Sequence, residues 1–298
     1  MTHRTPRILL VAAARPNFMK VAPVWRALDA LKQFHITLVH TGQHYDDNMS
    51  KVFFDDLRLP RPDVHMGVGS GTHGEQTAKV ILAFEPVMKD ADPDLVVVVG
   101  DVNSTMACTL VSVKLDVPVA HVEAGLRSFD RKMPEEINRM VTDILCDLLF
   151  TTSPEARDNL LREGVDDQKI HFVGNVMIDS LRFYAADAEK SNILETLGLE
   201  KKKYGLVTLH RPSNVDDAFQ LAKLMQALVE IGAECPLIFP VHPRTRHVME
   251  RAGIEVPGSR MRLVDPIGYL DFMKLMTYSC MVLTDSGGIQ EETTALGI

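Results

Sequence analysis

Short apolar runs alternate with longer segments of helical spacing along this chain. The runs Ile8–Ala14 and Leu95–Val99 are continuously apolar, as is typical of strands buried on both faces of a parallel sheet. Residues 17–32 place apolar side chains at helical spacing directly after the first run. For the first half we expect strands at 8–14, 35–40, 95–99, 117–122, 148–152 and 169–173, with helices at 17–32 and 104–115.

A second series of the same kind follows Gly174. We expect helices at 177–190, 216–231, 244–252, 269–279 and 288–297, and strands at 205–209, 237–241, 262–265 and 281–284. Such alternation predicts an α/β protein with parallel sheets and helices on both faces. We place the domain boundary at Gly174, which gives an N-terminal domain, 1–174, and a C-terminal domain, 175–298.

Bulk composition excludes several function classes. A net charge of −8 argues against a general nucleic-acid partner, although a nucleotide ligand needs only a local basic patch. The longest apolar run is far shorter than the roughly 18 residues of a membrane span, so we expect no membrane partner. The spacing of the cysteines does not match that of metal ligands, so we expect no metal site. We expect all four to be reduced residues of the core, in a cytoplasmic protein. They are Cys108, Cys146, Cys235 and Cys280.

The stretch from Pro118 to Met140 gathers charge where a buried strand ends. Glu123 and Arg127 follow the predicted strand, and Glu135 opens a helix that carries Arg139. Such a cluster is costly to bury unless its charges are paired. It is therefore either a salt-bridge network of the loop or a site for chemistry and ligand binding.

Ligands of open parallel sheets bind beyond the carboxyl ends of the strands. Polar or charged residues follow nearly every predicted strand, and this pattern favours one large site. These residues are Arg15, Gln43, His44, Asp101, Glu123, His210, Arg211, His242 and residues 285–288. Ser286 and Gly287 lead into a helix, where they could bind a diphosphate or serve only as an N-cap and a turn. The first strand lacks the glycine fingerprint of nicotinamide dinucleotide folds.

Eight motifs in order along the chain resemble those of the non-hydrolysing UDP-N-acetylglucosamine 2-epimerases. They are ARPNFMKVAP (14–23), TGQH (41–44), GD (100–101), HVEAGLR (121–127), PEEINR (134–139), TLHRPSN (208–214), PVHPRT (240–245) and TDSGGIQEE (284–292). The resemblance implies a glycosyltransferase-B-like fold, in which two Rossmann-like domains hold the nucleotide sugar in the cleft. It also implies a UDP-sugar substrate, no cofactor and a homodimer.

The same resemblance implies roles for individual residues. The family interconverts UDP-N-acetylglucosamine and UDP-N-acetylmannosamine by eliminating UDP and re-adding it to 2-acetamidoglucal. The matching acid and base candidates are Asp101, Glu123, Glu135 and His210, with no proton assigned to any one of them. The matching substrate-binding and UDP-binding positions are Arg15, Lys20, Arg139, His242, Ser286, Gly287 and Glu292, the last of them for the ribose.

The chain also departs from the family pattern. The family continues past the position of Ile298, so we expect an incomplete second domain and impaired turnover. Pro212 stands where many bacterial members have an arginine, and residues 45–47 follow the QH of TGQH in a region that also differs, so we expect weak or absent activation by UDP-N-acetylglucosamine. Two alternatives stay open: a 2-epimerase of a UDP-diacetamido uronic acid, or a nucleotide-sugar-binding protein whose turnover is impaired by truncation.

Overall fold

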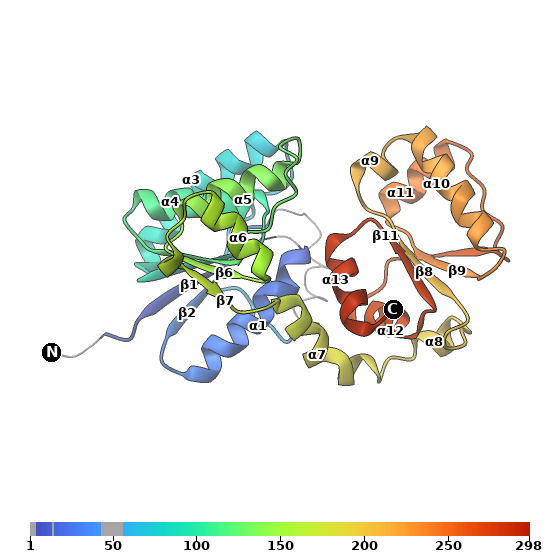
Figure 1. Cartoon of the computed structure of the whole chain (residues 1–298), viewed down its shortest axis with the longest axis horizontal. Coiled ribbons are helices and arrows are strands. Elements are labelled where there is room, and N and C mark those ends of the chain that lie inside the picture. Colours follow the sequence, from blue (N-terminus) through green and yellow to red (C-terminus); the bar gives the residue numbers. More distant parts are fainter. Residues whose placement is uncertain (1–3, 14, 43–55) are drawn as a thin grey trace. The chain divides into compact units, whose positions relative to one another are not determined.

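The computed structural model describes residues 4–13, 15–42 and 56–298 (Figure 1). The chain divides into two compact units, Met1–Ser180 (unit 1) and Leu181–Ile298 (unit 2). The division falls inside helix α7 (Val176–Ala188), shortly after Gly174, where the sequence places the domain boundary.

Unit 1 is built on a seven-stranded sheet in which all neighbouring strands are parallel. Its order is β3-β2-β1-β4-β5-β6-β7. The strands are β1 (Arg7–Ala12), β2 (His35–His40), β3 (Val64–His65), β4 (Leu95–Val99), β5 (Val119–Ala124), β6 (Leu148–Thr151) and β7 (Ile170–Phe172). The chain runs outward in both directions from β1 and β4, so the topological switch point lies between these two strands.

Helices cover both faces of this sheet. α1 (Arg15–Leu31) lies on one face, and α3 (His73–Ala91), α4 (Asn103–Lys114), α5 (Pro134–Leu145) and α6 (Pro154–Arg162) lie on the other (Figure 1). The short helix η1 (Asp167–Lys169) leads into β7. Helix α6 illustrates how the sequence begins these helices: Ser153 caps it by accepting from the Ala156 amide, and proline occupies the first turn.

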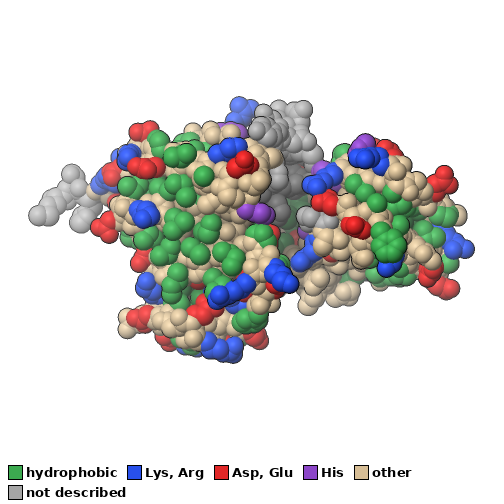
Figure 2. Space-filling view, turned by 90° about the horizontal axis from the view of Figure 1, so that it is seen from above, with side chains coloured by type: hydrophobic (Ala, Val, Ile, Leu, Met, Phe, Trp, Pro, Cys, Tyr) green, Lys and Arg blue, Asp and Glu red, His purple; other side chains and the backbone are tan. Residues whose placement is uncertain are grey.

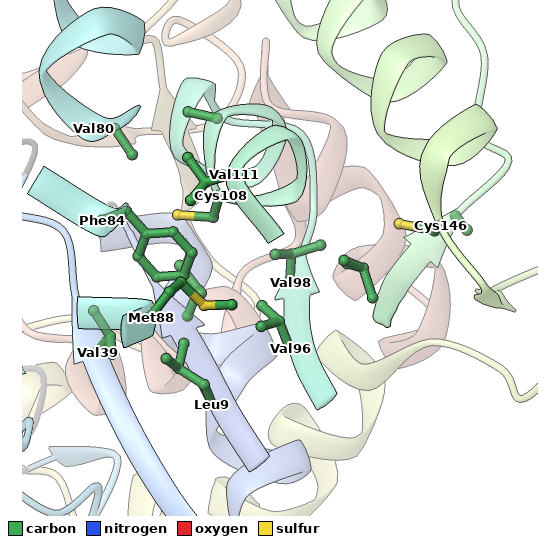
Figure 3. Close-up of a cluster of buried hydrophobic side chains, with 14 of the residues drawn as sticks. Leu9, Val39, Val80, Phe84, Met88, Val96, Val98, Cys108, Val111 and Cys146 are labelled. Carbon is green, nitrogen blue, oxygen red and sulfur yellow. The ribbon is translucent and has the colours of Figure 1, made fainter. Parts of the chain in front are cut away.

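The core of unit 1 lies between the sheet and the α3–α4 layer. Leu9, Val96 and Val98 project from the strands toward Phe84 and Met88 of α3 (Figure 3). All five side chains are buried, and burial of each contributes about 1.5–3 kcal/mol relative to exposure. The unbroken aliphatic sequence of β4 follows from this two-sided packing.

Helix α3 is the largest element that the sequence pattern does not predict. It begins at a capping box in which the Thr72 hydroxyl accepts from the Glu75 amide and the Glu75 carboxylate accepts from the Thr72 amide. The Thr-x-x-Glu spacing is a recognisable start signal that would have located it. Although α3 has 19 residues, neither it nor another helix in the described part of the chain is long and apolar enough to cross a membrane.

Unit 2 repeats the same topology on a smaller scale. Its sheet has the order β10-β9-β8-β11, again parallel. The strands are β8 (Gly205–Thr208), β9 (Leu237–Pro240), β10 (Met261–Val264) and β11 (Met281–Thr284). The helices are α8 (Ile193–Thr196), α9 (Pro212–Val215), α10 (Ala218–Ile231), α11 (Pro243–Arg251), α12 (Tyr269–Tyr278) and α13 (Gly287–Leu296). The switch point lies between β8 and β11.

The predicted α/β class with two parallel sheets is therefore confirmed, but the prediction for the cysteines is only half right. Cys108 and Cys146 are buried in the core. Cys235 is partly exposed and Cys280 is exposed, so the expectation that all four are core residues is wrong. The reason is that Cys235 and Cys280 precede β9 and β11 and lie outside the strands that their apolar neighbours form.

Candidate functional site

Two ion pairs form at the carboxyl edge of the unit 1 sheet, next to its switch point. The Lys20 ammonium lies 2.6 Å from Glu123 Oε2 and donates to Glu123 Oε1 at 2.7 Å. The Arg139 guanidinium pairs with the Asp101 carboxylate. The structure thus brings together four sequence-predicted residues from α1, β5, α5 and the end of β4. Each acid has a cationic partner within the protein.

Glu123 owes its position to an irregularity in β5. The pairing of β5 with β6 shifts register between Val122 and Ala124, so Glu123 is the extra residue of a β-bulge. Its φ angle is 75°, which is uncommon for a residue other than glycine. Its side chain is only 11% exposed. A strained backbone at a partly buried carboxylate is typical of a functional site.

Asp101 is fixed by groups that the sequence reasoning did not select. Asn138 Nδ2 donates to the Asp101 carbonyl at 2.8 Å and to Asn103 Oδ1 at 3.2 Å. Arg139 Nη1 also donates to Glu136 Oε2 at 3.1 Å. Asp101 is thereby tied to the second turn of α5, and through Asn138 to the start of α4.

The Glu136 side chain binds the backbone of the loop that precedes α5. Its carboxylate accepts from the amides of Ser128 and Phe129 at 2.8 and 3.0 Å. Burial alone would raise the pKa of Glu136, but these hydrogen bonds hold it below its ordinary value. Glu136 therefore remains a carboxylate that orders the loop.

A buried network lies behind these pairs. His121 donates from Nδ1 to Asp143 at 2.6 Å and from Nε2 to the Gly100 carbonyl at 2.8 Å. Because both partners accept, both ring nitrogens donate and the ring is cationic. Burial would lower the pKa of His121, but the Asp143 charge outweighs it and raises the pKa. Arg127 bridges Asp143 at 2.7 Å and Glu163 at 2.6 Å. Of the two alternatives for the charged stretch from Pro118 to Met140, a salt-bridge network is therefore the correct one for His121 and Arg127.

The other predicted residues of unit 1 are less constrained. Glu135 lies in the first turn of α5, is partly exposed, and has no ion pair or hydrogen bond through its side chain within the described part of the chain. The backbone of Arg15 begins α1, but its side chain lies outside what the structure describes. Gln43, His44 and residues 45–47 also lie outside the described residues.

Asp285 organises the switch point of unit 2. Its carboxylate accepts from the amides of His210 and Arg211 at 3.1 and 3.0 Å and from Asn214 Nδ2 at 2.9 Å. His210 Nδ1 lies 2.7 Å from Asp285 Oδ1. Burial opposes ionisation of Asp285, but these hydrogen bonds lower its pKa far below the ordinary value. The His210 side chain is 59% exposed, so its other nitrogen can reach a ligand.

Helix α13 begins directly after Asp285. Ser286 caps it by accepting from the Ile289 amide at 3.4 Å, and Gly287 is its first residue. One turn on, Glu292 is 1% exposed, and its Oε1 has no hydrogen-bond partner among the described residues. Burial raises the pKa of Glu292 to about 7, an effect that the Glu291 charge strengthens and Tyr269 partly opposes.

His242 lies at the start of α11, after β9. Its Nδ1 accepts from the Arg244 amide at 3.3 Å, so part of its role is that of an N-cap. Arg244 pairs with Asp216 at 2.7 Å, and Arg211 Nε donates to the Asp285 carbonyl at 2.7 Å. The two arginines that the sequence places near histidines are thus partly engaged inside unit 2. Among the described residues, no group of three or more His, Cys, Asp or Glu side chains could hold a metal ion.

Nearly the whole chain matches a known protein family and its curated relatives. A family described as UDP-N-acetylglucosamine 2-epimerase matches residues 26–298. A UDP-N-acetylglucosamine 2-epimerase of Methanococcus maripaludis is 40% identical over 98% of this chain and 81% of its own length. A UDP-2,3-diacetamido-2,3-dideoxy-D-glucuronate 2-epimerase of Pseudomonas aeruginosa is 43% identical over the same shares, 98% and 81%.

A solved structure shows the same fold. The UDP-GlcNAc 2-epimerase of Methanocaldococcus jannaschii, in complex with UDP-GlcNAc and UDP, matches with a TM-score of 0.90 at 40% identity. The match covers 98% of this chain and 82% of that one. The two Rossmann-like units thus have the glycosyltransferase-B-like architecture that the motifs imply.

Proposed function

Because this chain belongs to the UDP-N-acetylglucosamine 2-epimerase family, we propose that it interconverts UDP-N-acetylglucosamine and UDP-N-acetylmannosamine. In the proposed reaction a base removes the C2 proton while the bond from C1 to the diphosphate oxygen breaks and UDP departs. The resulting 2-acetamidoglucal regains a proton at C2 on its other face as UDP adds back to C1. Epimerisation then needs proton-transfer groups on two faces of the sugar.

The observation that carries this proposal is the pair of acids at neighbouring strand ends. Asp101 follows β4, Glu123 ends the regular part of β5, and each is held by one cation, Arg139 or Lys20. Glu135 adds a third carboxylate at the start of α5, without such a partner among the described residues. Carboxylates in unlike environments can act as acid and base in one reaction.

The geometry of unit 2 supports binding of the UDP part. The His210 ring, oriented by ionised Asp285, can donate to a departing diphosphate from its exposed nitrogen. The amides at the start of α13, after Ser286, favour an anion. The unpartnered Oε1 of Glu292 suits a ribose hydroxyl, which would donate to it. In this proposal Arg15 and His242 complete the contacts to the substrate.

Proton NMR of UDP-N-acetylglucosamine with the protein in deuterated water tests the reaction. We expect the C2 proton signal to disappear and the anomeric signal of the mannosamine epimer to appear, because the returning proton comes from solvent. Binding of UDP without C2 exchange would contradict the enzymatic proposal and favour a nucleotide-sugar-binding protein.

Variants then test the assignment of the acids. Asp101→Asn, Glu123→Gln and Glu135→Gln should each lower kcat by about 100-fold or more, the usual contribution of a positioned acid or base. The matched control is Glu155→Gln, since Glu155 is an exposed carboxylate in the first turn of α6. Turnover of all three variants at the control rate would place the chemistry elsewhere.

The Pseudomonas relative supports a second candidate, the 2-epimerisation of a UDP-2,3-diacetamido uronic acid. A uronate adds a carboxylate to the sugar, which needs a cation beside it. Lys20 and Arg139 are both engaged with acids of unit 1, which favours the uncharged sugar. Competition between the two substrates in the NMR assay decides between them: the true substrate has the higher kcat/KM.

We also propose that the protein is a homodimer. Leu82 of α3, Val113 of α4, and Ile137 and Ile144 of α5 are exposed apolar side chains on neighbouring helices. Figure 2 looks onto this helix layer and shows hydrophobic side chains gathered over it. Exposed apolar patches of this kind mark association surfaces. Light scattering should give a molar mass of twice that of the chain, and Leu82→Glu should reduce it to the mass of a single chain. A monomeric parent protein would refute the proposal.

A further inference from the structure

Two cysteines that are far apart in sequence meet at the amino-terminal edge of the unit 2 sheet. Cys235 precedes β9 and Cys280 precedes β11, the strands on either side of β8. Their Sγ atoms are 3.0 Å apart, although 45 positions separate the residues. This contact is a product of the fold, which explains why no spacing in the sequence announces it.

The backbone around β8 holds the two thiols in place. Cys280 donates its amide to the Tyr204 carbonyl at 2.9 Å, and the Gly205 amide donates to the Pro236 carbonyl at 2.9 Å. A Cβ added to Gly205 would lie 2.6 Å from Leu237 Cδ2 and 3.1 Å from Met281 Cγ. Leu237 and Met281, which follow the two cysteines in the flanking strands, therefore pack closely over Gly205.

The four cysteines fall into two chemically different pairs. Cys108 and Cys146 are buried, and burial raises the pKa of both thiols well above the ordinary value. Cys280 is exposed and Cys235 partly exposed, so a reagent reaches them without unfolding. Burial and the neighbouring Cys280 raise the pKa of Cys235 to about 11. Cys280 is then the thiol that meets a reagent first, and Cys235 lies within reach to complete the reaction.

We propose that Cys235 and Cys280 form a reversible intramolecular disulfide by exchange with low-molecular-weight disulfides. The Cys280 thiolate attacks one sulfur of the reagent and releases one thiol; Cys235 then attacks the mixed disulfide and releases the second. The two protein thiols lose two protons and two electrons, and the reagent disulfide is reduced to two thiols. The sulfurs must approach by about 1 Å to reach the disulfide length.

The position of this site predicts what the bond does. It would tie the chain entering β9 to the chain entering β11, across β8. Asp285 follows the opposite end of β11, five residues beyond Cys280 and so about 16 Å away along the strand direction, and His210 follows the same end of β8. We therefore expect oxidation to stabilise unit 2 by closing a long loop while the UDP-binding end stays open.

Thiol counting by mass spectrometry tests the proposal. The native protein is incubated with excess oxidised glutathione, then denatured and alkylated. We expect four alkylated cysteines before oxidation and two after it, and dithiothreitol should restore four. Tryptic digestion of the oxidised form should link the peptide 224–244 to the peptide that begins at Leu275. The oxidised form should also melt several degrees higher than the reduced form.

Single variants provide the controls. Cys280→Ser and Cys235→Ser should each abolish the linked peptide and the shift in Tm, whereas Cys146→Ser, which changes a buried cysteine, should retain both. Four alkylated cysteines after oxidation, glutathione retained on both surface cysteines, or links between chains would each overturn the proposal. An unchanged Tm in a fully linked protein would refute the stabilising role.

Discussion

Replacing Gly125 with alanine tests whether close packing behind β5 positions Glu123. Gly125 follows the bulge, has a φ angle of 79°, and donates its amide to Asp143 at 3.1 Å. A Cβ built there would lie 2.3 Å from the carbonyl oxygen of Ala156 in α6. The substitution therefore forces either the loop or α6 to move.

The expected loss of stability has two parts. An alanine at this positive φ costs about 1–2 kcal/mol. Because Cβ atoms do not approach closer than 3.0 Å, the contact must also open by 3.0 − 2.3, or about 0.7 Å. Overpacking of this kind typically costs about 1–3 kcal/mol. We expect Gly125→Ala to lower the free energy of unfolding by about 2–5 kcal/mol.

Gly164→Ala is the matched control. Gly164 has a φ angle of 86° but no atom within 4 Å of its added Cβ, so it carries the backbone cost alone, about 1–2 kcal/mol. Urea unfolding followed by fluorescence of Trp25, the single tryptophan, reports on unit 1. Equal losses in the two variants would refute the idea that contact with α6 constrains the loop. We also expect only Gly125→Ala to lower kcat, because only Gly125 adjoins the bulge.

Three further substitutions test the charge arrangement. Asp143→Asn should lower the free energy of unfolding by about 3–5 kcal/mol, because it leaves His121 and Arg127 buried without their shared carboxylate. Asp285→Asn should lower kcat by about 100-fold, because the His210 ring loses the carboxylate that orients it. Glu292 has a folded-state pKa of about 7, so the folded state binds the extra proton and stability should fall as pH rises from 4.5 to 7. That loss is about 3 kcal/mol by pH 8, and Glu292→Gln should abolish it, as urea midpoints at pH 5 and pH 8 would show.

Each of these expectations has an outcome that contradicts it. A wild-type urea midpoint for Asp143→Asn would show that the buried network is not needed for folding. Asp216→Asn, which removes the partly exposed partner of Arg244, is the control for Asp285→Asn; equal rates for the two would remove the His210 pair from the mechanism. A parallel pH dependence in the parent and Glu292→Gln would assign the effect to another group.

The strand–helix alternation could be predicted because buried parallel strands leave a simple apolar signature. Two elements without a continuous apolar run were not predicted. Helix α3 carries polar residues between its buried positions, and β3 is only two residues long. Motif matching located Asp101, Glu123, Lys20 and Arg139, and the structure brings them together as two ion pairs. Asp285 and Asn138 lie inside matched motifs, but neither was assigned a role, because a residue that orients another by hydrogen bonds has no spacing of its own.

The contacts of the cysteines illustrate the same limit. Local apolar context correctly placed Cys108 in the core, but the same context was misleading for Cys235 and Cys280. Strand order decides which strand ends are neighbours, and strand order follows from packing over the whole unit. The bulge at Glu123 was equally invisible, because a register shift belongs to a pair of strands and cannot be seen in one.

Because of the bulge, the position of the Glu123 side chain depends on the number of residues in β5 more than on which aliphatic residues they are. Exchanging one aliphatic residue for another in β5 would leave the Glu123 carboxylate where it is. Deleting the residue before Glu123 would restore a regular ladder with β6, in which Glu123 takes a paired position and the bulge that now sets the direction of its side chain is lost. Sequence drift in this strand should therefore proceed by substitution, with insertions and deletions confined to the loops beyond it.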